Sequence, residues 1–157
     1  HILITGSRGS GKTTLLERLL KEGMLPGGEQ AGICSFALRN RDGTPSQIIL
    51  EDRSDGQQQA IAEGFVPGKG PKVKAEVLDH FGVQAIEHAK SASGCWAVID
   101  EVGFLENASP AYCRALLSLF DQKRIAAVLR KKDTALIGAI RSRTDAVCFD
   151  LDDFEKE

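Results

Sequence analysis

The sequence predicts an α/β fold of the phosphate-binding-loop (P-loop) class: a three-layer sandwich with a mainly parallel sheet, helices on both faces and an antiparallel hairpin. The first observation is that short apolar runs alternate along the chain with segments carrying apolar residues at helical spacing. The second is that the apolar run at residues 2–4 precedes the loop sequence Gly-Ser-Arg-Gly-Ser-Gly-Lys-Thr at residues 6–13, and a helical pattern follows at 14–20. This strand–loop–helix order predicts a ligand site at the carboxyl end of the first strand.

The loop matches the pattern G-x-x-x-x-G-K-[ST]. Its glycines allow close approach of the backbone, and its N–H groups form an anion site with the helix N-terminus. We expect Lys12 to contact the β- and γ-phosphates and Thr13 to be a ligand of Mg²⁺. The substrate is predicted to be ATP, GTP or another nucleoside triphosphate. Arg8, inside the loop, can reach phosphate or solvent, and solvent is favoured. The predicted nucleotide-binding residues are Gly6, Ser7, Arg8, Gly9, Ser10, Gly11, Lys12, Thr13 and Thr14.

Two β-rich runs follow the first helix, at residues 32–38 and 47–50. The turn sequence Asn-Arg-Asp-Gly at 40–43 lies between them, which predicts an antiparallel hairpin. Residues 56–74 are polar and rich in Gly and Pro, so we expect a mobile loop without regular structure there.

The second half of the chain continues the alternation of helices and strands. Ser109-Pro110 is a strong helix start, with Ser as N-cap and Pro at the first helical position. The acidic tail after Asp152 is a candidate start of a further helix. The other expected elements are a helix at 77–92 that Gly82 divides, a buried strand at 96–99, a strand at 125–129, a helix at 134–143 and a strand at 146–151.

An acidic pair, Asp100 and Glu101, follows the buried strand at 96–99. A nucleotide site that uses Mg²⁺ needs a carboxylate at such a strand end, and Asp100 is placed to hold the metal opposite Thr13. Glu101, on the other side of the strand end, is placed to activate a water for in-line attack on the γ-phosphorus. The alternative is that the pair merely ends a strand, but the phosphate loop favours a catalytic role.

Composition predicts one domain, residues 1–157, of a soluble protein. The formal net charge of −2 argues against a general nucleic-acid or membrane-surface role. No apolar run is long enough to cross a membrane, and we expect a cytoplasmic location. The four cysteines are far apart, which predicts small buried residues in a reducing compartment.

Residues 99–106, Ile-Asp-Glu-Val-Gly-Phe-Leu-Glu, resemble the D-E-[IV]-G-x-[ML]-E signature of the thermophilic nucleoside-triphosphatase family, and the resemblance covers nearly the whole chain. It implies slow hydrolysis of several nucleoside triphosphates on a core related to RecA-like and additional-strand ATPases. It also implies that Glu101 is the catalytic glutamate and that Asp100 lies on the Mg²⁺ side. Two departures concern base selectivity: Phe104 stands where relatives are often polar or basic, and residues 44–47 lack an R-x-G-F-like stretch.

Arg130 matches a family arginine at a strand end, where a guanidinium stabilises charge on the transferring phosphoryl group or stacks on the base. A surface arginine is the equal alternative. The predicted catalytic set is therefore Glu101, Lys12 and Arg130, with Thr13 and Asp100 as metal ligands. A kinase for a nucleotide or small molecule and a nucleotide-dependent regulatory switch are the rival functions, and the sequence leaves open whether there is a protein partner. For Trp96 a core position is favoured over base stacking, and His80 with His88 is a poor metal site.

Overall fold

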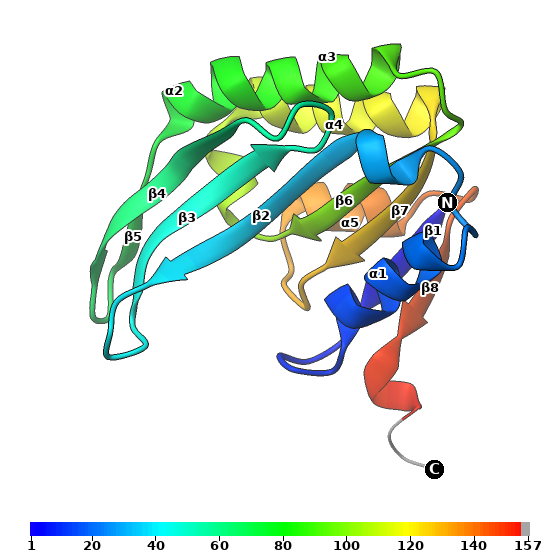
Figure 1. The fold of residues 1–157 in the computed structure, drawn as a ribbon. Helices are drawn as coiled ribbons and strands as arrows, with labels where there is room; N and C mark the ends of the chain where they lie inside the picture. The colour runs from blue at the N-terminus through cyan, green and yellow to red at the C-terminus, as the bar shows by residue number, and fades with distance from the viewer. Residues whose placement is uncertain (155–157) are drawn as a thin grey trace.

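Eight strands form one mixed sheet, in the order β5-β4-β3-β2-β6-β7-β1-β8, in a computed structural model that describes residues 1–154 (Figure 1). Neighbouring strands are parallel from β2 through β6, β7 and β1 to β8, and we call these five strands the parallel half. Strands β3, β4 and β5 continue the sheet from β2 in antiparallel order and form the antiparallel extension. The strands are β1 (Ile2–Thr5), β2 (Gly32–Arg39), β3 (Pro45–Asp52), β4 (Gln58–Val66), β5 (Gly70–Val73), β6 (Trp96–Val102), β7 (Arg124–Leu129) and β8 (Val147–Asp150).

Helices cover both faces of the parallel half, which confirms the predicted three-layer arrangement. The helix α1 (Lys12–Lys21) lies on one face, where Leu16 packs with Ile4 and Val98. On the other face, α3 (Val83–Ser91), α4 (Pro110–Gln122) and α5 (Ala135–Arg141) pack on alternate residues of the same strands (Figure 1). The shorter elements are η1 (Gly28–Gln30), α2 (Ala75–Val77), η2 (Leu78–Gly82), η3 (Leu105–Ala108) and η4 (Leu151–Asp153).

The central strands are apolar because both of their faces are covered. The side chains of Ala97, Val98 and Ile99 in β6 have no exposed surface, and neither do those of residues 125–129 in β7. Strands buried on both faces are apolar throughout instead of alternating with polar residues. The apolar runs in the sequence therefore identified β6 and β7 correctly.

The segment 56–74 is not the irregular loop that its composition predicts. Residues Gln58–Val66 form β4 and residues Gly70–Val73 form β5, and both pair in the sheet. Its glycines have backbone roles: Gly64 has φ +67° and lies where the β4–β5 register shifts. A glycine at such a bulge takes a backbone angle that other residues avoid. The glycines of this segment therefore belong to a bulge and a turn within the β4–β5 hairpin, and not to an irregular loop.

The helical segment 75–91 continues through Gly82 instead of dividing there. Gly82 has right-handed helical angles, and η2 passes directly into α3. A Cβ atom at this position would lie 2.7 Å from Cδ2 of Tyr112. Gly82 therefore allows close contact between this segment and α4, and it does not end a helix.

The starts of α4 and α5 agree with the sequence prediction. The Ser109 hydroxyl accepts a hydrogen bond from the Tyr112 N–H (3.1 Å), and the Thr134 hydroxyl accepts one from the Ile137 N–H (3.2 Å). Both are N-cap contacts that satisfy a free donor of the first helical turn. At the candidate helix start after Asp152 the structure has the short η4 turn, which ends at Asp153, and the rest of that prediction falls on residues 155–157, outside the described residues.

The cysteines differ from the prediction of a uniformly buried set. Cys95 and Cys148 are exposed, Cys34 and Cys113 are half-buried, and all four are free thiols. Trp96 is partly buried against the core on the α1 face, as the favoured interpretation required. Within residues 1–154, no helix has the length and apolar character that a membrane span requires.

Candidate active site

The carboxyl ends of β6, β7, β1 and β8 lie at the same edge of the sheet because these strands are parallel. Each of these strand ends carries a polar or charged group, and the loop of residues 6–11 joins the end of β1 to α1. Ligands of open α/β sheets bind at this edge. The predicted site residues that follow these strands therefore lie at the same edge of the sheet.

The phosphate loop encloses the end of the Lys12 side chain. Lys12 Nζ donates hydrogen bonds to the carbonyl oxygens of Gly6 (3.0 Å) and Ser7 (2.9 Å). Gly6 is required sterically, because a Cβ atom there would lie 2.5 Å from the Ser10 hydroxyl oxygen. Gly11 precedes α1 with φ +92°, a left-handed conformation that favours glycine. The loop thus leads directly into α1, so that its N–H groups and the lysine lie close together.

Thr13 and Asp100 face each other across the gap between α1 and β6. The Thr13 hydroxyl donates to Asp100 Oδ1 at 3.1 Å. Asp100 is 9% exposed, and burial raises the pKa of its carboxyl, while the hydrogen bond from Thr13 opposes this shift. A hydroxyl and a buried carboxylate are hard oxygen donors of the kind that Mg²⁺ accepts. This pair fits a magnesium ion.

Glu101 and Arg130 form an ion pair at the next position along this edge. Arg130 Nε donates to Glu101 Oε1 at 2.6 Å, and the side chains of Arg130 and Glu101 are 48% and 25% exposed, respectively. Arg130 directly follows β7, and its N–H donates to the Val102 carbonyl oxygen at 2.9 Å. Arg130 is therefore fixed beside the acidic pair, and it is not an isolated surface arginine.

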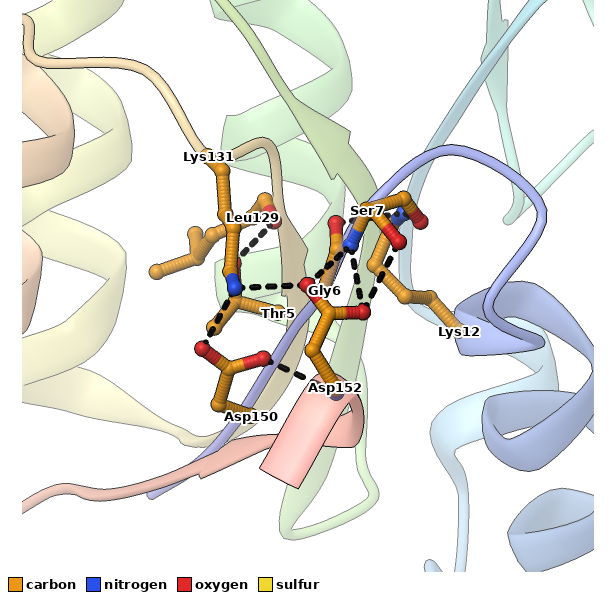
Figure 2. A network of polar contacts seen from close by, with 8 residues as sticks. All are labelled: Thr5, Gly6, Ser7, Lys12, Leu129, Lys131, Asp150 and Asp152. Atoms are coloured by element: carbon orange, nitrogen blue, oxygen red, sulfur yellow. Dashed lines mark hydrogen bonds and ion pairs between the residues drawn. The ribbon is translucent and has the colours of Figure 1, made fainter. Parts of the chain in front are cut away.

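A network that the sequence analysis did not anticipate holds the phosphate loop from the side of β8 (Figure 2). The Asp152 carboxylate accepts hydrogen bonds from the Ser7 N–H (3.0 Å) and the Ser7 hydroxyl (2.8 Å). Lys131 Nζ lies 2.6 Å from Asp152 and 2.7 Å from Asp150. These contacts hold the pKa of Asp152 well below its usual range, and the contact with Lys131 has the largest effect. Asp152 therefore stays ionised and links the loop to Lys131.

The signal for this network was present in the sequence. Asp150 and Asp152 follow the apolar run of β8, in the same way that Asp100 and Glu101 follow the apolar run of β6. The distance in sequence from Ser7 to Asp152 conceals their contact, which depends on β8 pairing with β1.

Glu106 is a second group whose place only the structure shows. It is 6% exposed, and its Oε2 accepts a hydrogen bond from the Gly103 N–H at 3.1 Å. Burial raises the pKa of this carboxyl to about 7, with a smaller contribution from the charge of Glu101, while the hydrogen bond from Gly103 opposes the shift. Glu106 therefore supports the turn after β6 with a carboxyl group that changes its charge near neutral pH.

A cleft of about 840 Å³ contains most of the predicted site. One end is formed by the phosphate loop with Lys12, Thr13, Glu101 and Arg130, and the other end is formed by apolar residues of β2, of the antiparallel extension and of the turn after β6. Ser10, Thr14 and Asp100 do not line it. The predicted site residues that line the cleft are Gly6, Ser7, Arg8, Gly9, Gly11, Lys12, Thr13, Glu101 and Arg130.

The two histidines that were considered as metal ligands, His80 and His88, do not line this cleft. His88 Nδ1 lies 2.6 Å from Asp52 Oδ2 at the end of β3, so His88 pairs with a carboxylate and not with His80. Asp55 completes a group of possible metal ligands with these two residues. Because Asp52 pairs with Ile33 at the start of β2, this group is at the opposite edge of the sheet from the phosphate loop.

A phosphate loop on β1, an acidic strand end on the nearby β6 and the strand β7 between them define a P-loop nucleotide-hydrolysing fold. Comparison with known proteins agrees. The family described as NTPase matches residues 1–157, and the chain belongs to this family of nucleoside triphosphatases.

Individual relatives match along nearly the whole chain. The nucleoside-triphosphatase THEP1 of Methanothermobacter thermautotrophicus is 33% identical over 96% of this chain and 86% of its own length. THEP1 of Thermotoga sp. strain RQ2 is 28% identical over 97% and 86% of the two chains. The crystal structure of THEP1 from Aquifex aeolicus superposes with a TM-score of 0.73 at 22% identity, covering 96% of this chain and 88% of that one, which shows the same fold.

Proposed function

We propose that this single P-loop domain hydrolyses a nucleoside triphosphate to the diphosphate and phosphate in a Mg²⁺-dependent reaction. The observation that carries the proposal is the convergence of a lysine and two residue pairs at one edge of the sheet. Lys12 lies within the phosphate loop, Thr13 contacts Asp100, and Glu101 contacts Arg130. Phosphoryl transfer requires these parts: a phosphate cradle, metal ligands, and a group that orients the attacking water.

The phosphate loop and Lys12 would hold the β- and γ-phosphates. In the structure the Lys12 ammonium group is hydrogen-bonded to two loop carbonyls, so it is already directed to the space that the loop encloses. The loop N–H groups and the start of α1 supply further positive potential without any movement.

Thr13 and Asp100 would hold the magnesium ion, which neutralises charge on the phosphate oxygens when bound. Asp100 is a carboxylate in a buried place, where its charge is unfavourable without a nearby cation. The Thr13 hydroxyl is 3.1 Å away and completes the donor pair. The fit thus depends on two oxygen donors on neighbouring elements.

Glu101 would take a proton from the attacking water, and Arg130 would stabilise charge on the transferring phosphoryl group. The two side chains are paired in the structure at 2.6 Å. A bound γ-phosphate gives Arg130 a second anionic partner. Movement of the guanidinium toward the phosphate would leave a Glu101 oxygen free to accept the proton of water.

The test is Glu101→Gln, which keeps the size of the side chain and removes its charge. We expect this variant to bind nucleotide but to lose turnover by about 100-fold or more, because general-base catalysis typically contributes at least that much. Phosphate release and nucleotide binding are measured with ATP, GTP, CTP and UTP in the presence of Mg²⁺. Lys12→Ala serves as the comparison variant, because it should lose binding as well. Turnover at the wild-type rate in Glu101→Gln would show that Glu101 is not the base.

Slow turnover and a broad base preference, which the family resemblance implies, stay predictions that the same panel of nucleotides measures. A cytoplasmic location and a role as a regulatory switch also stay predictions. The kinase alternative differs from these, because a specific feature of the cleft favours phosphoryl transfer to a bound molecule.

A further inference from the structure

The cleft continues past Glu101 onto the antiparallel extension. Across the sheet the order is β4, β3, β2, β6, β7, β1, so the phosphate loop and the extension lie on opposite sides of the strand that carries Glu101. Ser35 in β2 marks the boundary, because its hydroxyl lies within 3.5 Å of the Glu101 backbone N–H. The lining beyond this boundary is mostly apolar and includes Phe36 and Ala37 of β2 and Ile48, Ile61 and Phe65 of the extension, while Phe104 lines the cleft from the turn after β6.

The in-line geometry of phosphoryl transfer determines which part of a ligand this apolar end can bind. The attacking and leaving oxygens lie on opposite sides of the γ-phosphorus, and the nucleoside is attached to the leaving diphosphate. This step rests on the proposed function, in which Glu101 acts on the attacking group. The space beyond Glu101 is then on the attacking side, whereas the nucleoside of the substrate extends the other way.

The cleft as a whole is much larger than the attacking water molecule requires. A water molecule occupies about 30 Å³ of liquid, whereas small-molecule sites are typically clefts of about 300–1,000 Å³ with apolar walls and a few convergent polar groups. The cleft has about 840 Å³ in total, and its lining includes Phe104, a large apolar side chain that is 43% exposed. Ser35, Glu101 and Glu106 are the polar groups at the junction of its two ends. An aromatic wall beside a general base suits a flat molecule with a hydroxyl group.

We propose that the apolar end binds a nucleoside as phosphoryl acceptor, with its ring against Phe36 and Phe104 and a hydroxyl group at Glu101. An uncharged ring matches the apolar lining. The charged groups beside it are Arg39, which is exposed and donates to the Gly43 carbonyl oxygen, and Lys132, whose Nζ lies 6.0 Å from the centroid of the Phe104 ring. Aromatic side chains hold flat rings by stacking or edge contact. The chain is then a nucleoside-triphosphate hydrolase that also transfers phosphate to an alcohol.

The transfer balances without any further reactant. The acceptor oxygen forms a bond to the γ-phosphorus, and the bond from that phosphorus to the β–γ bridging oxygen breaks. The bonding electrons leave with the nucleoside diphosphate, and the hydroxyl proton passes to the Glu101 carboxylate and then to solvent. The products are a nucleoside monophosphate, a nucleoside diphosphate and a proton.

The experiment incubates the full chain with Mg²⁺ and ATP, and with adenosine, guanosine, cytidine, uridine or thymidine in turn. Chromatography quantifies nucleoside monophosphate, and a phosphate assay quantifies hydrolysis. We expect at least one nucleoside to yield its monophosphate, with diphosphate formed in excess of free phosphate. If diphosphate equals free phosphate with all five, the acceptor proposal is wrong while the hydrolase proposal stands. If neither product forms, the hydrolase proposal fails as well.

Two phenylalanine variants separate the cleft from a general effect on the fold. Phe104→Ala removes part of the apolar wall and should lower the ratio of nucleoside monophosphate to free phosphate by about 10-fold, since a ring that no longer stacks on an aromatic side chain binds more weakly by about that factor. Phe149→Ala is the matched control: its side chain is 42% exposed, like that of Phe104, but it lies on β8 and does not line the cleft. This control should leave the ratio unchanged. An equal ratio in wild type and Phe104→Ala would overturn the placement of the acceptor.

Discussion

The parallel half and the antiparallel extension of the same sheet supply different parts of the site. In the parallel half, the ends of β6, β7, β1 and β8 meet at one edge and bring together carboxylates, cations and the phosphate loop. In the extension, successive strands run in opposite directions, so their ends cannot gather charged groups at one edge. The extension instead presents the sides of its strands, which form an apolar wall. Strand direction thus separates phosphate chemistry from the walls of the cleft.

The turn after β6 joins these two regions. Glu101 faces Arg130 of the parallel half, and Phe104 and Glu106, which follow Glu101 in the turn, line the same cleft as the residues of the extension. The buried Glu106 carboxyl beside Gly103 supports this turn. Changes at the turn, in the parallel half and in the extension should therefore differ in kind and in size.

The largest of these effects is expected at Glu106. The folded pKa of about 7 lies above the unfolded value of 4.5, so the folded chain holds a proton that the unfolded chain has released between these pH values. The free energy of unfolding therefore falls as pH rises from about 4.5 to about 7, by a total on the order of 3 kcal/mol. Glu106→Gln keeps an acceptor for Gly103 and should remove this fall. Urea unfolding of both proteins from pH 4 to pH 8 measures it.

The matched control for Glu106→Gln is Glu29→Gln, which makes the same change in net charge at an exposed position. Above pH 7 we expect Glu106→Gln to be more stable than the wild type, because no buried carboxylate has to be ionised. Parallel stability curves for the wild type and Glu106→Gln would refute the assignment of this pH dependence to Glu106.

A smaller effect is expected where Asp152 holds the phosphate loop of the parallel half. Asp152→Asn removes the charge that contacts Ser7 and Lys131, so the loop loses part of its preorganisation. We expect kcat/KM for nucleoside triphosphate to fall by about 10-fold, mainly through a higher KM, because ordering the loop then draws on binding energy. Steady-state kinetics over a range of nucleotide concentrations measures it.

Asp153→Asn is the control for this loss of charge, because Asp153 is the exposed neighbour of Asp152 in η4. It should retain wild-type kcat/KM. A uniform fall in both variants would indicate a general effect of charge near the loop instead of the contact with Ser7.

The difference between the two regions also explains how far the sequence alone could predict this molecule. The parallel half was predictable because burial on both faces makes β6 and β7 apolar throughout, and because the phosphate loop and the pair Asp100–Glu101 follow strands. In the extension, the antiparallel hairpin that adds β3 was predicted and is confirmed, but β4 and β5 were missed, because they are partly exposed and carry glycines at a bulge and a turn. Local composition there is the same as that of a loop, and pairing with β3 decides the outcome.

The site shows the same limit. Lys12, Thr13, Glu101 and Arg130 were named from local patterns, and the structure brings them to one cleft. The role of Asp152 depends on the pairing of β8 with β1, and the burial of Glu106 depends on how η3 packs. Such contacts are set by tertiary structure, and no spacing within one segment encodes them.

The smallest effect is expected in the extension, at the ion pair between Lys74 Nζ and Glu63 Oε2, which are 3.3 Å apart. Glu63→Gln should lower the free energy of unfolding by less than about 1 kcal/mol, because both side chains are partly exposed and water and salt screen the pair. Nucleoside-triphosphate turnover should stay unchanged, since Glu63 does not line the cleft. Urea unfolding at low and high salt, beside the exposed Glu29→Gln as control, resolves the ion pair. A marked fall in turnover would show that the extension takes part in the phosphate chemistry, and the division between the two regions would then be wrong.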